Sequence, residues 1–279
     1  VIRRYQSNED NVFFAYSEFS YNTLIGAYEP FLDIICNMHR RFIGGSFDDF
    51  QKECGVYYLH RQVLNSYYET GECFREEMVL LNEVAYEQRR MTMAIADMLK
   101  RLSEVKPLMI VINRFQMASK SSIETIKYLI DNPCANIGIV LGVNALVKGA
   151  DSTLEVWDSI VESLEDRSAV YYIGSAGQLK NTVKTTNDDE MYITMNFEQS
   201  IQEASNIMEF LDFEQAKRGC RIIEHKLKFE EAWIDEKSLR RFYMVYARTS
   251  VLLGEMSKAI ELTNEFKALI PENDSEHYL

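Results

Sequence analysis

Apolar and polar positions alternate along the first two thirds of the chain in a way that predicts short buried strands separated by helices. Leu108 to Ile112 form an unbroken apolar run after Pro107, which is typical of a buried parallel strand. After a polar loop, apolar residues recur at spacings of three and four from Ile123 to Ile130, which predicts a helix. Three serines are candidates for the N-cap of this helix: Ser119, Ser121 and Ser122.

Two further segments have the composition of strands and lie between helical patterns. Val12 to Phe19 is rich in aromatic residues, and Asn136 to Asn144 is an apolar run that ends in a polar side chain. Helical spacing is present from Pro30 to Phe42 and again from Phe74 to Glu104, where we expect one long helix or a helix pair. Together with a third strand predicted at 169–173, this alternation indicates a parallel sheet covered by helices on both faces.

The remaining segments of this part have weaker patterns. Val1 to Tyr5 has the pattern of a helix end and is followed by a polar turn. Residues 47–70 fit helices and short strands equally well, and residues 154–164 predict a short helix. Residues 175–189 are polar and aperiodic, which places a domain boundary there. The expected organisation is an α/β domain over residues 1–175, a linker over 176–196 and a helical region over 197–279.

The last third of the chain is helical throughout. Apolar periodicity predicts helices joined by short turns at residues 197–210, 214–229, 237–253 and 256–269. Antiparallel helix pairs that repeat in sequence are typical of a solenoid.

The second helix pair resembles the tetratricopeptide repeat (TPR) at several offsets. The matching residues are Tyr243, Ala247, Gly254, Ala259 and Pro271. Small residues let paired helices approach closely, and a glycine permits the left-handed turn between them. The first pair is similar at Ala204, Leu211 and Ala216. In the second helix of the second pair, the usual aromatic and alanine are replaced by Thr263 and Phe266. The resemblance implies an all-α TPR-like region that binds a protein or peptide, and a generic helical hairpin is the alternative.

Composition narrows the class of protein. The chain has 279 residues, 47% of them hydrophobic, with only 4 prolines and 12 glycines, which indicates packed, helix-rich structure. A net charge of −13 argues against a nucleic-acid surface, because phosphate contacts need clustered lysine and arginine. No apolar run approaches the roughly 20 residues that span a bilayer, and the first residues lack the apolar core of a signal peptide. We therefore expect a cytoplasmic protein without membrane contact.

Side chains that commonly carry catalysis or bind metals are scattered. The 4 histidines and 5 cysteines have no metal-ligand spacing, so neither a zinc site nor a disulfide framework is predicted. No serine stands in a GxSxG frame, and no cysteine and histidine share a local signature. No residue is assigned a catalytic role on these grounds.

The segment from Lys106 to Leu129 resembles the Walker B region of the signal-transducing ATPases with numerous domains, the STAND class of AAA-like P-loop proteins found in large bacterial LuxR-type regulators. That family has a hydrophobic strand, two acids and an aromatic-Ala-Asp segment before a Ser-Leu helix start. The frame is kept by Phe115, Gln116, Ala118, Ser122 and Ile123. The acids are replaced by Asn113, Arg114 and Ser119. A Tyr-x-Pro-Phe helix start at residues 28–31 is also similar to the family.

The resemblance implies an incomplete P-loop NTPase-like sheet over residues 1–175. It places Asn113 and Arg114 at the Walker B position and Asn144 at the strand end that senses the γ-phosphate, so these are the candidate nucleotide-binding residues. The GxxxxGK[ST] loop that cradles phosphates is absent from the chain and is expected just upstream. ATP or ADP with magnesium is therefore expected in a complete protein, whereas this chain alone is expected to bind neither.

By the same resemblance we expect a regulatory signal-transduction protein, such as a transcriptional regulator. A degenerate nucleotide-binding domain would be coupled to a TPR-like sensor, and the nucleotide state would gate homo-oligomerisation or an output domain. Arg114 brings a positive charge where a base would act, which favours a switch over a hydrolase. Two alternatives remain open: a pseudo-ATPase scaffold for protein interactions, and an active ATP hydrolase with an unusual Walker B site.

Overall fold

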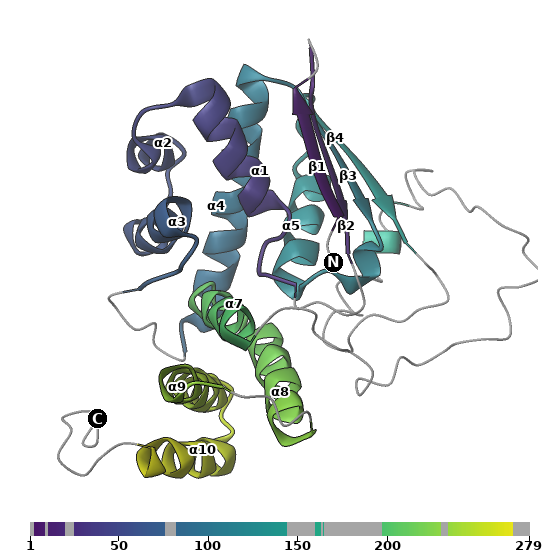
Figure 1. Cartoon of the computed structure of the whole chain (residues 1–279). Coiled ribbons are helices and arrows are strands. Elements are labelled where there is room, and N and C mark those ends of the chain that lie inside the picture. The colour runs from purple at the N-terminus through teal and green to yellow at the C-terminus, as the bar shows by residue number, and fades with distance from the viewer. Residues whose placement is uncertain are drawn as a thin grey trace, which may run out of the picture.

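The computed structural model describes residues 3–8, 11–19, 25–75, 82–143, 160–162, 164, 197–229 and 234–269. Within these ranges a small mixed sheet packed with helices is followed by an all-helical region (Figure 1). The predicted order of an α/β part and then a helical part is therefore confirmed.

The sheet has four strands in the order β1 (Arg3–Asn8), β2 (Phe13–Glu18), β3 (Leu108–Asn113) and β4 (Ile137–Gly142). β2, β3 and β4 run parallel, and β2 and β3 bury alternate side chains. The strands predicted from the apolar runs are confirmed within one or two residues at their ends. Asn144 and the strand predicted at 169–173 lie outside the described residues.

The helix end predicted at Val1 to Tyr5 is wrong. Residues from Arg3 onward form β1, which pairs antiparallel with β2 and places Tyr5 opposite Tyr16. So short a segment carries no helical period of its own, and pairing with the edge of β2 determines its conformation. The sheet is consequently mixed rather than wholly parallel.

Helices cover one face of the sheet in the described part of the chain. α1 (Phe31–Met38), α4 (Val84–Val105) and α5 (Lys120–Asp131) lie together on the face that buries Phe13 and Leu108 (Figure 1). On the opposite face, Met109 and Val140 are 37% and 53% exposed. The prediction that helices cover both faces of the sheet is therefore confirmed for one face. Of the helix predicted over residues 154–164, the structure describes only residues 160–162 and 164.

Helices between β2 and β3 resolve the segment that the sequence left open. A π-helical turn (His39–Ile43) extends α1 and ends at Gly44, whose φ of +68° favours glycine. α2 (Phe47–Glu53) begins at Ser46, whose hydroxyl accepts the backbone N–H of Asp49. α3 (Tyr58–Thr70) ends at Gly71 in the left-handed conformation. Residues 47–70 are therefore two helices, and the long helix predicted from Phe74 is α4, which begins at Val84.

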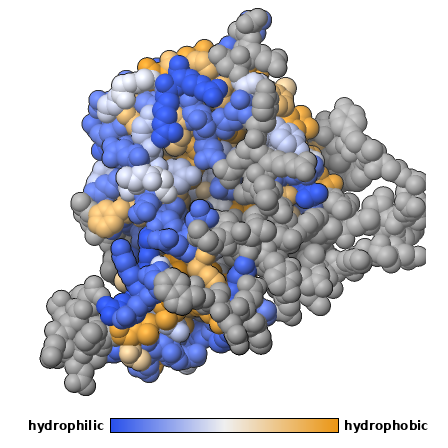
Figure 2. Space-filling view, in the orientation of Figure 1, coloured by the Kyte–Doolittle hydropathy of each residue, from blue (hydrophilic) through white to orange (hydrophobic). Residues whose placement is uncertain are grey.

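The C-terminal helices match the predicted ranges closely. They are α7 (Phe197–Glu209), α8 (Phe213–Phe229), α9 (Glu236–Leu252) and α10 (Met256–Ala268). Gly254 takes a φ of +76° in the turn between α9 and α10, and Ala204 and Ala216 are fully buried. Figure 2 shows hydrophobic side chains gathered over this region. The exposed large hydrophobic residues of α9 and α10 include Met244, Val251, Met256 and Ile260.

The helical region packs against the α/β part through a shared hydrophobic core. Phe210, after α7, makes edge-to-face ring contacts with Tyr28 at 5.8 Å and with Tyr67 at 5.7 Å between centroids. The predicted linker over 176–196 lies outside the described residues. Among the helices that are described, none is long and apolar enough to cross a membrane.

Candidate functional site

The first candidate site lies at the carboxyl ends of β2 and β3. Asn113 is the last residue of β3, and Arg114 follows in the left-handed conformation, with φ 58° and ψ 42°. A short 3-10 turn (Phe115–Met117) then leads to Ser119, the N-cap of α5. The edge formed by the carboxyl ends of parallel strands is where α/β folds usually bind ligands.

Glu18 connects the two sequence-predicted residues at this edge. Its Oε1 accepts a hydrogen bond from Nδ2 of Asn113 at 3.4 Å and lies 3.5 Å from Nη2 of Arg114. Its Oε2 accepts from the hydroxyl of Tyr16 at 3.3 Å. Arg114 also donates through Nη1 to the carbonyl of Phe19 at 3.4 Å. The structure therefore brings Asn113 and Arg114 together around a carboxylate that the sequence reading did not include.

The local backbone holds this arrangement in place. Oδ1 of Asn113 accepts the backbone N–H of Arg114 at 3.0 Å, which supports the left-handed residue. Gly142 of β4 lies so close that a Cβ there would stand 2.8 Å from the same Oδ1. A side chain at this position would therefore force the amide group of Asn113 to shift.

The charges at the sheet edge nearly cancel. Glu18 and Arg114 form one ion pair, with side chains 16% and 41% exposed. The other two side chains at this edge are an amide and a guanidinium, and neither is a carboxylate of the kind that Mg²⁺ prefers. Across the described residues, no group of three or more His, Cys, Asp or Glu side chains is placed to hold a metal ion. Among the described residues, this edge offers a polar ligand both donors and acceptors of hydrogen bonds, and it offers a cation one carboxylate, that of Glu18.

A second polar cluster lies where α5 meets the C-terminal helices. The hydroxyl of Ser121, in the first turn of α5, donates to Oδ2 of Asp212 at 2.9 Å and accepts the backbone N–H of Tyr28 at 3.1 Å. The backbone N–H of Ser121 reaches the same Oδ2 at 3.4 Å. Oδ1 of Asp212 accepts the backbone N–H of Gln215 at 3.4 Å. One carboxylate thus caps the N-termini of both α5 and α8.

Asp212 is buried, and burial raises the pKa of its carboxyl group. Hydrogen bonds from Ser121 and from the backbone of Gln215 favour the charged form and oppose that effect. The positive ends of two helix dipoles act in the same direction as the hydrogen bonds. The cluster is therefore a structural joint, satisfied internally, rather than an open ligand site.

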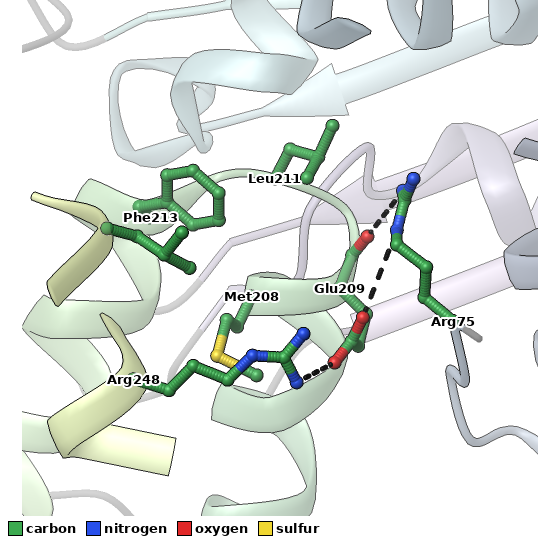
Figure 3. A pocket seen from close by; sticks show the side chains of 7 residues that line it. Arg75, Met208, Glu209, Leu211, Phe213 and Arg248 are labelled. Carbon is green, nitrogen blue, oxygen red and sulfur yellow. Dashed lines mark hydrogen bonds and ion pairs between the residues drawn. The ribbon is translucent and has the colours of Figure 1, made fainter. Parts of the chain in front are cut away.

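A third polar cluster belongs to the junction between the α/β part and the C-terminal helices. Its centre is Glu209, the last residue of α7, which lies between Arg75 and Arg248 (Figure 3). Its Oε1 accepts from Nη1 of Arg248 on α9 at 2.8 Å, and its Oε2 lies 3.9 Å from Nε of Arg75. Nη2 of Arg75 donates to the backbone carbonyl of Glu209 at 3.0 Å. Burial raises the pKa of the Glu209 carboxyl group, whereas the positive charges of Arg248 and Arg75 act to lower it.

Asn206 of α7 completes the junction. Its Oδ1 accepts the backbone N–H of Cys73 at 2.9 Å, and its Nδ2 donates to the carbonyl of Gly71 at 2.9 Å. Gln215 of α8 donates through Nε2 to the carbonyl of Ile25 at 3.1 Å. The helical region is thus attached to the α/β part by directional hydrogen bonds as well as by apolar packing.

The sequence reading missed the residues of this junction because no local motif joins them. Only Asp212 had a usable signal: an aspartate directly before the apolar periodicity of a helix is a typical N-cap. Comparisons of the chain with protein-family models, curated proteins and solved structures found no match. The functional argument therefore rests on the geometry of the sheet edge and of the junction.

Proposed function

We propose that this chain is the core of a regulatory protein of the STAND type, in which a nucleotide-binding domain that does not hydrolyse ATP is joined rigidly to a TPR-like partner-binding region. The observation that carries the proposal is the Arg114–Glu18 pair at the carboxyl end of β3. A guanidinium there cannot accept a proton from water, and the neighbouring carboxylate of Glu18 is paired with that guanidinium, which leaves it less free to act as a base. Nucleotide would act as a structural clamp.

The junction supports the regulatory part of the proposal. α5 begins within six residues of Arg114, and its first turn binds Asp212 at the start of α8. A ligand that moves the loop after β3 therefore acts on an element that α8 contacts directly. Such contact is the physical requirement for a change at the sheet edge to reach the helices.

The test measures ATP turnover by the chain after a phosphate-binding loop of the GxxxxGK[ST] type has been added before residue 1. We predict turnover far below about 1 per second, the low end of the ordinary enzyme range. Asn113→Asp combined with Arg114→Asp restores two acids and should raise turnover at least about tenfold. Arg101→Ala, which removes an exposed arginine paired with Glu104, is the matched control and should change nothing.

Three outcomes are informative. Wild-type turnover of about 1 per second or more contradicts the proposal and supports an active hydrolase. Absence of ATP and ADP binding even with the loop present supports a pseudo-ATPase scaffold instead. The 279-residue chain alone should show no thermal stabilisation by millimolar ATP with Mg²⁺, because it lacks the loop amides and lysine.

A further inference from the structure

The outer face of α9 carries a straight line of basic and apolar side chains. Its members follow one another at spacings of four and three residues, which keeps them on one side of a helix. They are Lys237, Arg241, Met244, Arg248 and Val251, here called the α9 stripe. All five are exposed or half-exposed, whereas the opposite side of α9 buries Phe242, Val245 and Tyr246. The stripe is therefore the face that α9 presents to solvent.

The α9 stripe is positively charged in a chain that is acidic overall. α9 has four basic residues and one acidic residue, while the whole chain has a net charge of −13. The acidic residue, Glu236, pairs with Arg240, which lies beside the stripe. Among the described residues, the side chains of Lys237 and Arg241 form no ion pair or hydrogen bond. Two cations of the stripe therefore have no counter-charge, and their field favours an anionic partner.

Arg248 belongs both to the stripe and to the junction. It donates through Nη1 to Oε1 of Glu209 at 2.8 Å, while its side chain stays 39% exposed (Figure 3). Arg75 of the α/β part contacts the same Glu209. A partner that lies along the stripe would therefore meet the polar cluster that attaches the helical region to the α/β part.

The stripe also offers apolar surface between its charges. Met244 and Val251 are 53% and 38% exposed, and each stands next to an arginine of the stripe. Methionine and arginine are enriched at protein interfaces relative to the rest of protein surfaces. A partner that fits must therefore combine negative charges with apolar side chains.

We propose that the α9 stripe docks an acidic amphipathic helix of a partner protein. The inference names the partner class for the TPR-like region, and in that respect it rests on the proposed function. Carboxylates of the partner would face Lys237, Arg241 and Arg248, and its apolar side chains would cover Met244 and Val251. The complementary charges give selectivity and fast association, and burial of the apolar pair adds affinity.

The spacing of the stripe favours a helix over an extended segment. Successive members of the stripe lie about 5 Å apart along the axis of α9, because 3.5 residues on average each rise by about 1.5 Å. A partner helix repeats one of its faces at the same interval. An extended chain repeats one face about every 6.6 Å, so over the four steps of the stripe it would shift by about one full step.

The experiment titrates the 279-residue chain with a labelled, alanine-rich helical peptide of about 18 residues and measures fluorescence anisotropy. The peptide carries glutamate and leucine at alternating spacings of three and four. Its binding should weaken several-fold when NaCl is raised from about 50 to 500 mM. A peptide with glutamine in place of glutamate, and one with the same composition in shuffled order, should each bind at least about tenfold more weakly. Absence of binding, or equal binding of the shuffled peptide, overturns the proposal.

Substitutions at exposed positions separate the stripe from the rest of the surface. Arg241→Glu should weaken peptide binding at least about tenfold, whereas Arg221→Glu makes the same charge change at an exposed position of α8 and should not affect it. Met244→Gln should weaken binding about threefold or more, whereas Met93→Gln on α4, where the methionine is 36% exposed, is the matched control. Equal losses in a variant and its control contradict the proposal.

Two other occupants would give different results. A single-stranded DNA of about 15 nucleotides that binds more tightly than the peptide, and is lost in Arg241→Glu, would mean that the stripe selects phosphates. A dimer in sedimentation experiments that Arg241→Glu dissociates would assign the stripe to a second copy of the chain. Either result overturns the proposal. The titration needs no nucleotide, so its failure is distinct from a failure of the ATP experiment.

Discussion

The sheet edge and the helix junction are both held by polar side chains, but they differ in burial and in how far apart their partners lie in the sequence. At the edge, Arg114 is 41% exposed and pairs with Glu18 on the neighbouring strand. At the junction, Asp212 is buried and binds Ser121, 91 residues earlier, while Arg75 binds Glu209 across 134 residues. The edge is a surface feature, whereas the junction is part of the interior.

This difference determines what each region can tolerate. An exposed ion pair contributes about 0–1 kcal/mol because water competes for both charges. A buried carboxylate that satisfies several donors leaves those donors orphaned when it is removed. The edge can therefore change its chemistry during evolution without unfolding the protein, and the junction cannot.

Asp212→Ala tests the junction most severely. The substitution removes the acceptor for Ser121 and Gln215, and we expect a loss of about 2–4 kcal/mol in the free energy of unfolding. Urea denaturation provides the measurement. Asp235→Ala removes a comparable cap from α9 at a partly exposed position and should cost clearly less. Equal losses in the two variants would mean that Asp212 is an ordinary cap and not a joint between two helices.

Acidification should also affect the interior more than the edge. Burial, together with the charges of Arg75 and Arg90, lowers the pKa of His60 to about 3, although Glu87 lies beside it. The unfolded chain protonates this histidine first, near its ordinary pKa of about 6.5, so stability falls as pH drops below that value. From pH 6.5 to 4.5 the loss attributable to His60 is about 2–3 kcal/mol.

His60→Gln supplies the measurement, because glutamine does not titrate. Its free energy of unfolding should decline less steeply than that of the wild type over the same pH range. Parallel pH profiles for the two proteins would show that His60 does not stay neutral in the folded state. The comparison uses the slope and not the absolute stability, which the substitution itself alters.

Arg114→Ala should have the smallest effect. Loss of an exposed ion pair with Glu18 predicts a change below about 0.5 kcal/mol in the free energy of unfolding. Arg101→Ala, which removes the ion pair with Glu104, is a matched control of similar exposure. A loss above about 1.5 kcal/mol for Arg114→Ala alone would place the edge in the same class as the junction.

Local periodicity was sufficient to predict most elements. The apolar run at β3, the serine cap of α5 and the C-terminal helix ranges were all readable because each depends on residues close in sequence. β1 was misread because its conformation depends on pairing with β2 rather than on its own pattern. Residues 47–70 gave no clear prediction, because the tyrosines there suit helices and strands equally. The structure forms two helices, which the Ser46 cap and the glycines at 55 and 71 delimit.

The candidate sites were predictable to a smaller extent. Asn113 and Arg114 were identified because they follow a recognisable strand, and Glu18 was missed because only the strand register places it beside them. The junction residues were missed because tertiary contacts alone bring them together. Asn144 lies outside the described residues, so its assignment stays a prediction.

The long separations at the junction have a consequence for how the protein is made. Asn206 satisfies backbone groups at Gly71 and Cys73, and Gln215 satisfies one at Ile25, 190 residues earlier. The α/β segment emerges from the ribosome before these helices are synthesised, so during that interval the nascent chain exposes these backbone groups and an apolar surface to water. Contacts this distant slow folding, and the exposed intermediate is prone to self-association. Synthesis of α7 and α8 is therefore the step that ends this vulnerable period.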